Sequence, residues 1–180
     1  MEKKNKILVV DDDPGWCEEL SEILKAAGYS VDNASSKELA LDEIIKSDNA
    51  VVIVDLHLGA EGLRGQEFSG FNLLEGLQFL KSISFSRSKP IVLSAYGGID
   101  QMRQAFKRGA YDFIQKQQFQ KDEFLKIIGE AVSLWLSENV GKNELSENEL
   151  EEYHQISRQF MRGKSTNFSV PDDARNPWAD

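Results

Sequence analysis

The chain has 180 residues, a formal net charge of −9, and a composition that is 41% hydrophobic and 28% charged. A chain of this length can bury one substantial core, so we expect one domain with an appendage. The acidic balance argues against a protein that grips nucleic acid or an anionic membrane through counterion release. The single cysteine, Cys17, excludes an intrachain disulfide and a multi-cysteine zinc site.

The amino-terminal residues are basic, but the apolar run that a signal peptide needs does not follow them. No stretch approaches the roughly 20 apolar residues of a membrane span. We therefore expect a cytoplasmic protein with no membrane partner.

Short apolar runs alternate with helix-period segments, a pattern typical of a mostly parallel sheet wrapped by helices. The runs lie at 7–10, 29–31, 51–54, 91–93 and 111–114. The run at 51–54 is β-branched on both faces, as expected of a central strand covered by helices on either side. The sequence predicts an α/β domain of five strands and five helices in βα alternation, ending near Asn139.

Helix signals lie between these runs. Asp13 followed by Pro14 predicts a cap and a first turn, with the helix continuing to about Ala27 and stopping at Gly28. Three further starts are predicted on similar grounds: Ser35 with Glu38 as a capping box, Asp100 as the cap of a helix closed by Gly109, and Asp122 as the cap of the last helix.

Two segments break the alternation. The loop 59–70 holds four of the 13 glycines directly after the third strand. The extension 140–180 begins after the domain 1–139. Within it, a capping box at Ser146 and one apolar stripe predict a helix over about 147–162, and the residues beyond are expected to be extended or disordered. The stripe is made by Leu150, Tyr153, Ile156 and Phe160.

Acidic residues follow two of the predicted strands. Asp11, Asp12 and Asp13 come after the first strand, and Asp55 comes after the third. In an open α/β sheet the carboxyl ends of central strands meet at one rim, which would bring these carboxylates within a few ångströms of one another. Like charges so close cost stability unless a cation binds, and all-oxygen ligands suit Mg²⁺.

Two more polar residues follow strands at the same rim. Ser94 comes after the fourth strand and Lys116 after the fifth. A metal, a carboxylate nucleophile, a hydroxyl and an ammonium together indicate a site for phosphoryl transfer.

Four motifs in this order resemble those of response-regulator receiver domains, over about residues 5–138. They are Ile-Leu-Val-Val-Asp-Asp-Asp-Pro at 7–14, Val-Val-Ile-Val-Asp-Leu-His-Leu at 51–58, Val-Leu-Ser-Ala at 92–95 and Gly-Ala-Tyr-Asp-Phe-Ile-Gln-Lys at 109–116. The resemblance implies a flavodoxin-like, doubly wound sheet of five parallel strands in the order 2-1-3-4-5, to which the carboxy-terminal helix would be an addition. It also implies a signalling switch of a two-component or phosphorelay pathway rather than a metabolic enzyme.

The resemblance assigns roles by position. Asp55 would accept a phosphoryl group from a histidine kinase or phosphotransfer protein. Asp12 and Asp55 would coordinate Mg²⁺, with Asp11 acting through water and the main-chain carbonyl of His57 as a further ligand.

It also implies which residues would respond to the phosphoryl group. Ser94 would hydrogen-bond one of its oxygens and Lys116 would pair with its charge. Both would have to move inward, and the space vacated would let Phe113, at the aromatic switch position, turn toward the core.

The sequence departs from the family in two places. Gln117 follows Lys116 where the family usually has proline, so we expect a trans peptide bond there. The interval from Asp55 to Ser94 (94 − 55 = 39) is longer than usual, and the loop 59–70 absorbs most of the excess. This loop could slow acyl-phosphate hydrolysis or dock a partner, or it could be a tolerated insertion.

Two other functions stay open. A pseudo-receiver would bind partners without being phosphorylated. A phosphatase resembling the haloacid-dehalogenase superfamily could use Asp11 and Asp13, but it would leave Asp55 unexplained.

The predicted output is contact with a downstream protein, unless the chain is a fragment of a longer protein. The sequence from Gly141 onward has 8 Asp and Glu against 5 Lys and Arg, and it contains no segment of helix-turn-helix size and no basic recognition helix. The apolar residues of 124–136 cover more of the last domain helix than one sheet contact requires. Either the stripe of the extension or a second copy of the protein, forming a homodimer, could cover the excess.

Overall fold

The computed structural model describes residues 5–58, 70–84, 86–95 and 97–139, with only the backbone described for 70–75. The predictions for the loop 59–70, apart from its last residue, and for the helix 147–162 lie outside the described residues. The described part contains no helix with the length and apolar character needed to cross a membrane.

Strands and helices alternate along the chain as the hydrophobic pattern predicts. In order they are β1 (Lys6–Val10), α1 (Pro14–Ala26), β2 (Ser30–Ala34), α2 (Lys37–Lys46), β3 (Asn49–Val54), α3 (Gly70–Ser84), β4 (Lys89–Ser94), α4 (Ile99–Lys107), β5 (Asp112–Gln115), the 3₁₀ turn η1 (Lys116–Gln118) and α5 (Lys121–Asn139). All strand pairs are parallel, and the strand order is β2-β1-β3-β4-β5. The predicted fold class and strand order are confirmed.

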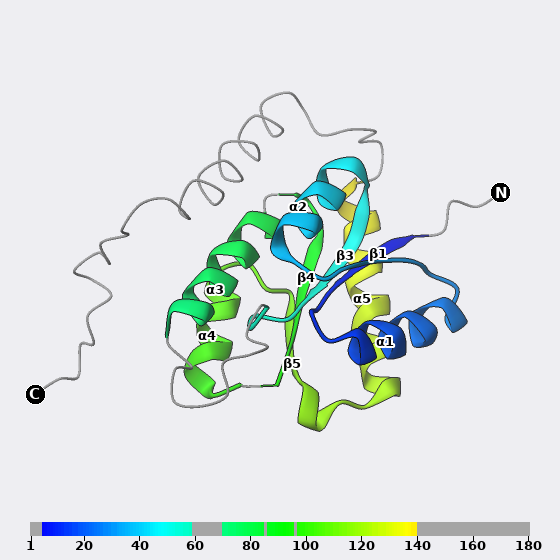
Figure 1. Cartoon of the computed structure of the whole chain (residues 1–180). Coiled ribbons are helices and arrows are strands. Elements are labelled where there is room, and N and C mark those ends of the chain that lie inside the picture. The colour runs from blue at the N-terminus through cyan, green and yellow to red at the C-terminus, as the bar shows by residue number, and fades with distance from the viewer. Residues whose placement is uncertain (1–4, 59–69, 85, 96, 140–180) are drawn as a thin grey trace, which may run out of the picture.

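The sheet lies between two layers of helices, with α1 and α5 on one face and α2, α3 and α4 on the other (Figure 1). Successive strand residues alternate between these faces, so Leu8 packs in the core on the α2–α4 side and Ile7 in the core on the α1–α5 side. Every residue of β3 is buried. This explains its β-branched run and makes it the central strand from which Asp55 emerges.

Helix starts follow the predicted signals in one case and differ in three. Asp13 caps α1, and its side chain accepts a hydrogen bond of 2.8 Å from the Gly15 amide. The cap of α2 is Ser36, not Ser35, because the Ser36 hydroxyl is the one that accepts a hydrogen bond, of 3.2 Å, from the Leu39 amide.

Asp100 and Asp122 also do not cap their helices. The cap of α4 is Gly98, and Asp100 lies inside the first turn, as does Asp122 in α5. A carboxylate is stabilised in a first turn by the helix dipole as well as at the cap, so both positions satisfy the same preference.

One glycine sets how closely α3 approaches the functional edge of the sheet. A Cβ atom at Gly76 would clash with the main-chain oxygen of Leu56, the residue after Asp55. Only glycine therefore lets α3 pack against this connection.

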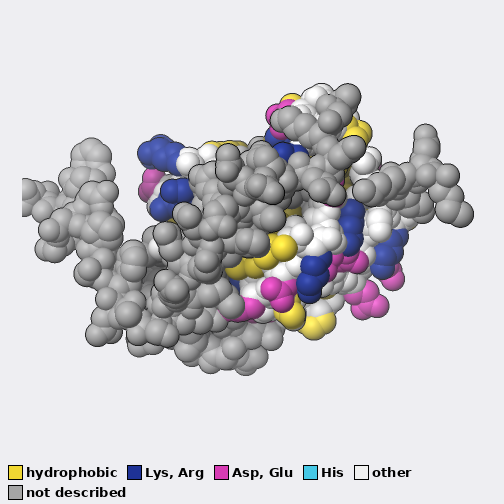
Figure 2. All heavy atoms as spheres, turned by 90° about the horizontal axis from the view of Figure 1, so that it is seen from above, with side chains coloured by type: hydrophobic (Ala, Val, Ile, Leu, Met, Phe, Trp, Pro, Cys, Tyr) yellow, Lys and Arg dark blue, Asp and Glu magenta, His cyan; other side chains and the backbone are white. Residues whose placement is uncertain are grey.

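The surface of the described part carries charges of both signs. On the face in Figure 2, lysine and arginine side chains lie beside aspartate and glutamate side chains and next to apolar atoms. The net negative charge of the chain therefore does not make this face uniformly acidic.

Candidate phosphorylation site

The two central strands deliver two carboxylates to one place. Asp11 follows β1 and Asp55 follows β3, and the ladder continues to both of them, since the Asp55 amide donates to the Val10 oxygen at 3.0 Å. Parallel strands in register end at the same edge, so their next residues face one another. This is the juxtaposition that the sequence predicts.

A single ammonium joins the two carboxylates. Lys116 Nζ lies 2.7 Å from Asp11 Oδ2 and 2.9 Å from Asp55 Oδ2. The three side chains are only 9%, 3% and 8% exposed, respectively. The cluster therefore carries one net negative charge in a nearly dry pocket, where charges interact strongly.

The surroundings shift the pKa values of these groups in different directions. Burial raises the pKa of Asp11 above its usual value despite the hydrogen bond from Lys116. Burial would also raise the pKa of Asp55, but hydrogen bonds from His57 and the Lys116 charge outweigh it and lower that pKa. Burial would lower the pKa of Lys116, whereas its two carboxylate partners raise it. Asp55 is therefore held as the anion, the form that a nucleophile requires.

A histidine links Asp55 to Ser94. The His57 amide donates to Asp55 Oδ1 at 3.0 Å, and His57 Nδ1 lies 3.0 Å from Ser94 Oγ. Ser94 is completely buried and the His57 ring is nearly so. The ring therefore lies inside the site and contacts the hydroxyl that the family resemblance assigns to the phosphoryl group.

The aspartates after β1 have different roles. Asp13 caps α1, as predicted, and its amide donates to Asp11 Oδ1 at 3.0 Å. Asp12 is half-buried. Within the described ranges, no three or more His, Cys, Asp or Glu side chains are grouped so as to hold a metal ion, so Asp12 does not join Asp11 and Asp55 as a ready three-carboxylate site.

The donor chemistry nevertheless fits a divalent cation. Two buried carboxylates already converge on one positive charge, the Lys116 ammonium, and carboxylate oxygens are the ligands of hard cations. The ligand set of Asp11, Asp12, Asp55 and the His57 carbonyl stays a prediction.

Comparison with known proteins identifies the family. The model of the response regulator receiver domain matches residues 7–129, which is more than half of the chain. The chain belongs to this family.

Two relatives illustrate the likeness and its extent. The nitrogen assimilation regulatory protein NtrX of Azorhizobium caulinodans is 34% identical over 128 residues, covering 70% of this chain but 26% of that protein. The response regulator TodT of Pseudomonas putida is 29% identical over 134 residues, covering 74% and 53%. The chain thus spans between a quarter and about half of the length of these curated relatives.

Solved structures share the fold. A response regulator of Thermotoga maritima has a TM-score of 0.61 at 25% identity, covering 73% of this chain and 99% of that one. One from Burkholderia pseudomallei, described with a phosphorylated aspartic acid, calcium ion and citrate, has a TM-score of 0.59 at 24% identity, covering 91% and 88%.

Phe113, which the resemblance places at the aromatic switch position, is buried in this receiver domain. Phe113 is 7% exposed and packs in the core on the α2–α4 side of the sheet. A Cβ atom at Gly97 would lie 2.8 Å from its ring, so the chain after Ser94 is fitted closely around it. Its ring is therefore already in the core here, and its movement on phosphorylation stays a prediction.

The unusual Gln117 has a structural role in the receiver domain. The Lys116–Gln117 peptide bond is trans, as predicted. The Gln117 side chain donates to the Ala95 oxygen at 2.9 Å, which links the turn after β5 to the residue after Ser94. Lys116 reaches both carboxylates from this backbone.

One contact of the site was missed from the sequence. The ammonium of Lys116 lies 5.2 Å from the centroid of the Trp16 ring, within the range of a cation–π interaction. Trp16 in turn packs edge-on against Phe119 at 5.5 Å. The sequence places a tryptophan in the first turn of α1, but no local pattern indicates that its ring meets Lys116.

Proposed function

We propose that this receiver domain is a phosphorylation-dependent signalling switch of a two-component or phosphorelay pathway. Asp55 accepts the phosphoryl group, and the donor is the phosphohistidine of a histidine kinase or of a phosphotransfer protein. The observation that carries the proposal is the Asp55 carboxylate, buried yet held ionised by Lys116 and His57. The phosphorylated aspartic acid of the Burkholderia pseudomallei relative supports it.

Mg²⁺ is the proposed cofactor. Asp11, Asp12, Asp55 and the main-chain carbonyl of His57 would hold it, with Asp11 acting through water. A bound divalent ion supplies positive charge to the phosphoryl oxygens during transfer. The Burkholderia pseudomallei relative is described with a calcium ion, which supports a divalent cation as the cofactor.

The switch follows from the contacts around Asp55. Once phosphorylated, Asp55 carries three additional acceptor oxygens, which compete for the ammonium of Lys116 and the hydroxyl of Ser94. Ser94 then exchanges its His57 contact for a phosphoryl oxygen, and this movement pulls on the chain between β4 and α4. Because Phe113 packs against Gly97 in that connection, the change reaches the surface around α4 and β5.

The output of the switch is contact with another protein in the cytoplasm. Nucleic acid and membrane are not the proposed partners, given the acidic sequence after the domain. A homodimer through α5 is a second proposed contact, since Leu134 and Leu136 on this helix are exposed.

The test is mass spectrometry of the intact, acid-quenched protein after incubation with Mg²⁺ and acetyl phosphate. We expect the wild type to gain one phosphoryl group and Asp55→Asn to gain none. The matched control, Asp13→Asn, changes a neighbouring carboxylate that serves as a helix cap, and should be phosphorylated like the wild type because asparagine also caps helices.

The two alternative functions give other results. A pseudo-receiver would show no mass gain in any variant. A haloacid-dehalogenase-like phosphatase would turn over the phosphodonor equally well with Asp55→Asn. Either result would contradict the proposed function.

A further inference from the structure

Helix α4 exposes an apolar stripe. Ile99 is 76% exposed and Phe106 is 44% exposed, with the half-buried Met102 between them. With Arg103 and Lys107 these side chains line a hollow of about 520 Å³. The opposite side of the helix is fixed in the core by Ala105. The stripe is therefore presented outward by a firmly anchored helix.

The rim of this α4 groove, as we call the hollow and its five lining residues, is basic. Arg103 and Lys107 lie one turn apart, and Arg103 pairs at 3.2 Å with Asp100, the one acidic residue of α4. The helix rim still has two cations against one carboxylate. Arg108 adds a further cation directly after the helix. An apolar floor with a cationic rim selects an occupant that is amphipathic and acidic.

The chain itself contains such a segment. Residues 144–152 include five glutamates and no lysine or arginine. They lead into the apolar stripe of Leu150, Tyr153, Ile156 and Phe160, whose spacing places these side chains on one face of a helix. The segment has the two properties that the α4 groove requires.

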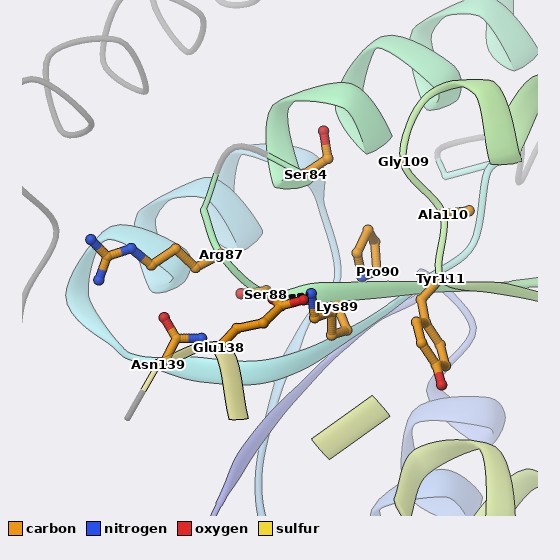
Figure 3. Close-up of a pocket in the computed structure, with 10 residues that line it drawn as sticks. All are labelled: Ser84, Arg87, Ser88, Lys89, Pro90, Gly109, Ala110, Tyr111, Glu138 and Asn139. Atoms are coloured by element: carbon orange, nitrogen blue, oxygen red, sulfur yellow. Dashed lines mark hydrogen bonds and ion pairs between the residues drawn. The ribbon is translucent and has the colours of Figure 1, made fainter. Parts of the chain in front are cut away.

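The chain leaves α5 at a point from which the acidic segment can reach the α4 groove. Asn139, the last residue of α5, lines the same hollow of about 440 Å³ as Gly109, which follows α4 by two residues (Figure 3). The ten residues 140–149 can span up to about 33 Å when extended, whereas the nine-residue α4 is only about 13.5 Å long. A segment docked in the α4 groove would therefore enter at the carboxy-terminal end of α4, where Lys107 and Arg108 would meet its glutamates first.

Helix α5, the other candidate surface, is less suitable. Its exposed Leu134 and Leu136 lie between Glu130 and Glu138 in the sequence, and the helix has four carboxylates against two lysines. An acidic segment would be repelled there. The charge on the two helices thus favours α4.

We propose that residues 144–160 dock in the α4 groove of the same molecule. The apolar stripe covers Ile99 and Phe106, and the glutamates pair with the basic rim. The occupied groove is then closed to any other protein.

The docked segment is also placed to respond to phosphorylation, a step that rests on the proposed function. Helix α4 begins five residues after Ser94 (99 − 94 = 5), so a shift of Ser94 moves the Ile99 end of the groove. We expect phosphorylation to loosen the segment and open the groove.

The test is hydrogen exchange of the full chain, read at the amides of 99–107. We expect Tyr153→Glu/Ile156→Glu to speed exchange there several-fold. Lys107→Glu should do the same, and adding Glu149→Lys/Glu151→Lys to it should restore protection. The matched control is Leu136→Glu, which makes the same apolar-to-acidic change on α5 and should leave the exchange of α4 unchanged.

Three results would overturn the docking. If α4 exchanges at the same rate in Tyr153→Glu/Ile156→Glu as in the wild type, the segment does not cover α4. Sensitivity to Leu136→Glu instead would place the segment on α5. Protection that rises with protein concentration would assign the groove to a second copy or another chain.

A separate arm tests the link to phosphorylation. Beryllofluoride with Mg²⁺ should speed α4 exchange in the wild type but not in Asp55→Asn. Docking without this response would overturn the proposed link through Asp55 and leave the docked segment standing. If the segment and Lys107 variants leave α4 exchange unchanged while beryllofluoride still changes it through Asp55, the docked segment is overturned and the link from Asp55 to α4 stands.

Discussion

Two lysines, Lys6 at the start of β1 and Lys116 directly after β5, each bridge a pair of carboxylates, and their surroundings differ sharply. Lys116 joins Asp11 and Asp55 at the carboxyl ends of the strands, where all three side chains are at most 9% exposed. Lys6, at the start of β1, pairs with Asp32 and with Glu43, and these side chains are between 28% and 40% exposed.

The difference shows how burial changes what the same group of charges can do. Around Lys6, water screens each charge, so the cluster adds little to stability and can be rearranged at little cost. Around Lys116, desolvation strengthens the interactions between the three charged side chains. Adding a phosphoryl group or a metal ion there must therefore rearrange these side chains. A switch requires the second kind of environment.

The largest expected effect comes from removing the buried lysine. Lys116→Met leaves two buried carboxylates facing each other, which should lower the free energy of unfolding by about 3 kcal/mol in metal-free buffer. Mg²⁺ should restore part of this loss, because it binds the folded carboxylates. Urea unfolding with and without Mg²⁺ measures both effects, and a loss that Mg²⁺ does not reduce would contradict a cation site here.

The pH dependence of that loss sharpens the comparison. The pKa of Lys116 is raised in the folded protein above 10.5. Its contribution is therefore fully present below pH 10.5 and is lost as the pH rises through the higher folded value. The difference in unfolding free energy between wild type and Lys116→Met should stay flat at neutral pH and shrink at strongly alkaline pH. A difference that grows with pH would show that folding does not raise the pKa of Lys116.

The next effect concerns the ring between Asp55 and Ser94. His57→Ala keeps the main-chain hydrogen bond to Asp55 but opens the pocket to water, so the acyl phosphate should form normally and hydrolyse several-fold faster. Loss of the phosphoryl mass with time, after removal of the phosphodonor, measures this. An unchanged or longer lifetime would show that the ring does not exclude water.

The smallest effect belongs to the exposed cluster. Lys6→Met should change the free energy of unfolding by less than about 1 kcal/mol, because its partners remain hydrated. Urea unfolding alongside Lys116→Met provides the comparison. Equal losses for the two variants would mean that burial does not distinguish the clusters.

Much of the fold could be predicted from the sequence because β1, β3 and β4 are buried apolar runs and α1 has a clear capping signal. The buried run of β3 and the cap at Asp13 are examples, and the strand order came from the family resemblance. The predicted caps of the later helices were wrong at Ser35, Asp100 and Asp122. Serine, aspartate and glycine all occur at caps, and a carboxylate is also stabilised inside the first turn, so neighbouring positions compete for the cap.

The sequence predicted which residues meet at the candidate site, because strand topology fixes their main-chain positions, but it did not predict all of their side-chain contacts. Asp11, Asp55 and Lys116 follow strand ends, so topology alone brings them together. The contacts of His57 with Ser94 and of Trp16 with Lys116 join residues 37 and 100 positions apart through their rotamers, and no local pattern encodes them. For the same reason the buried position of Phe113 was not foreseen.

The most direct test of the account is to locate the phosphoryl group. The protein is incubated with Mg²⁺ and acetyl phosphate, quenched in acid and mapped by peptide mass spectrometry. The account predicts one modified site, Asp55, and no modification when Mg²⁺ is removed. A phosphoryl group on Asp11, Asp12 or His57, or none on Asp55 in the presence of Mg²⁺, would contradict it.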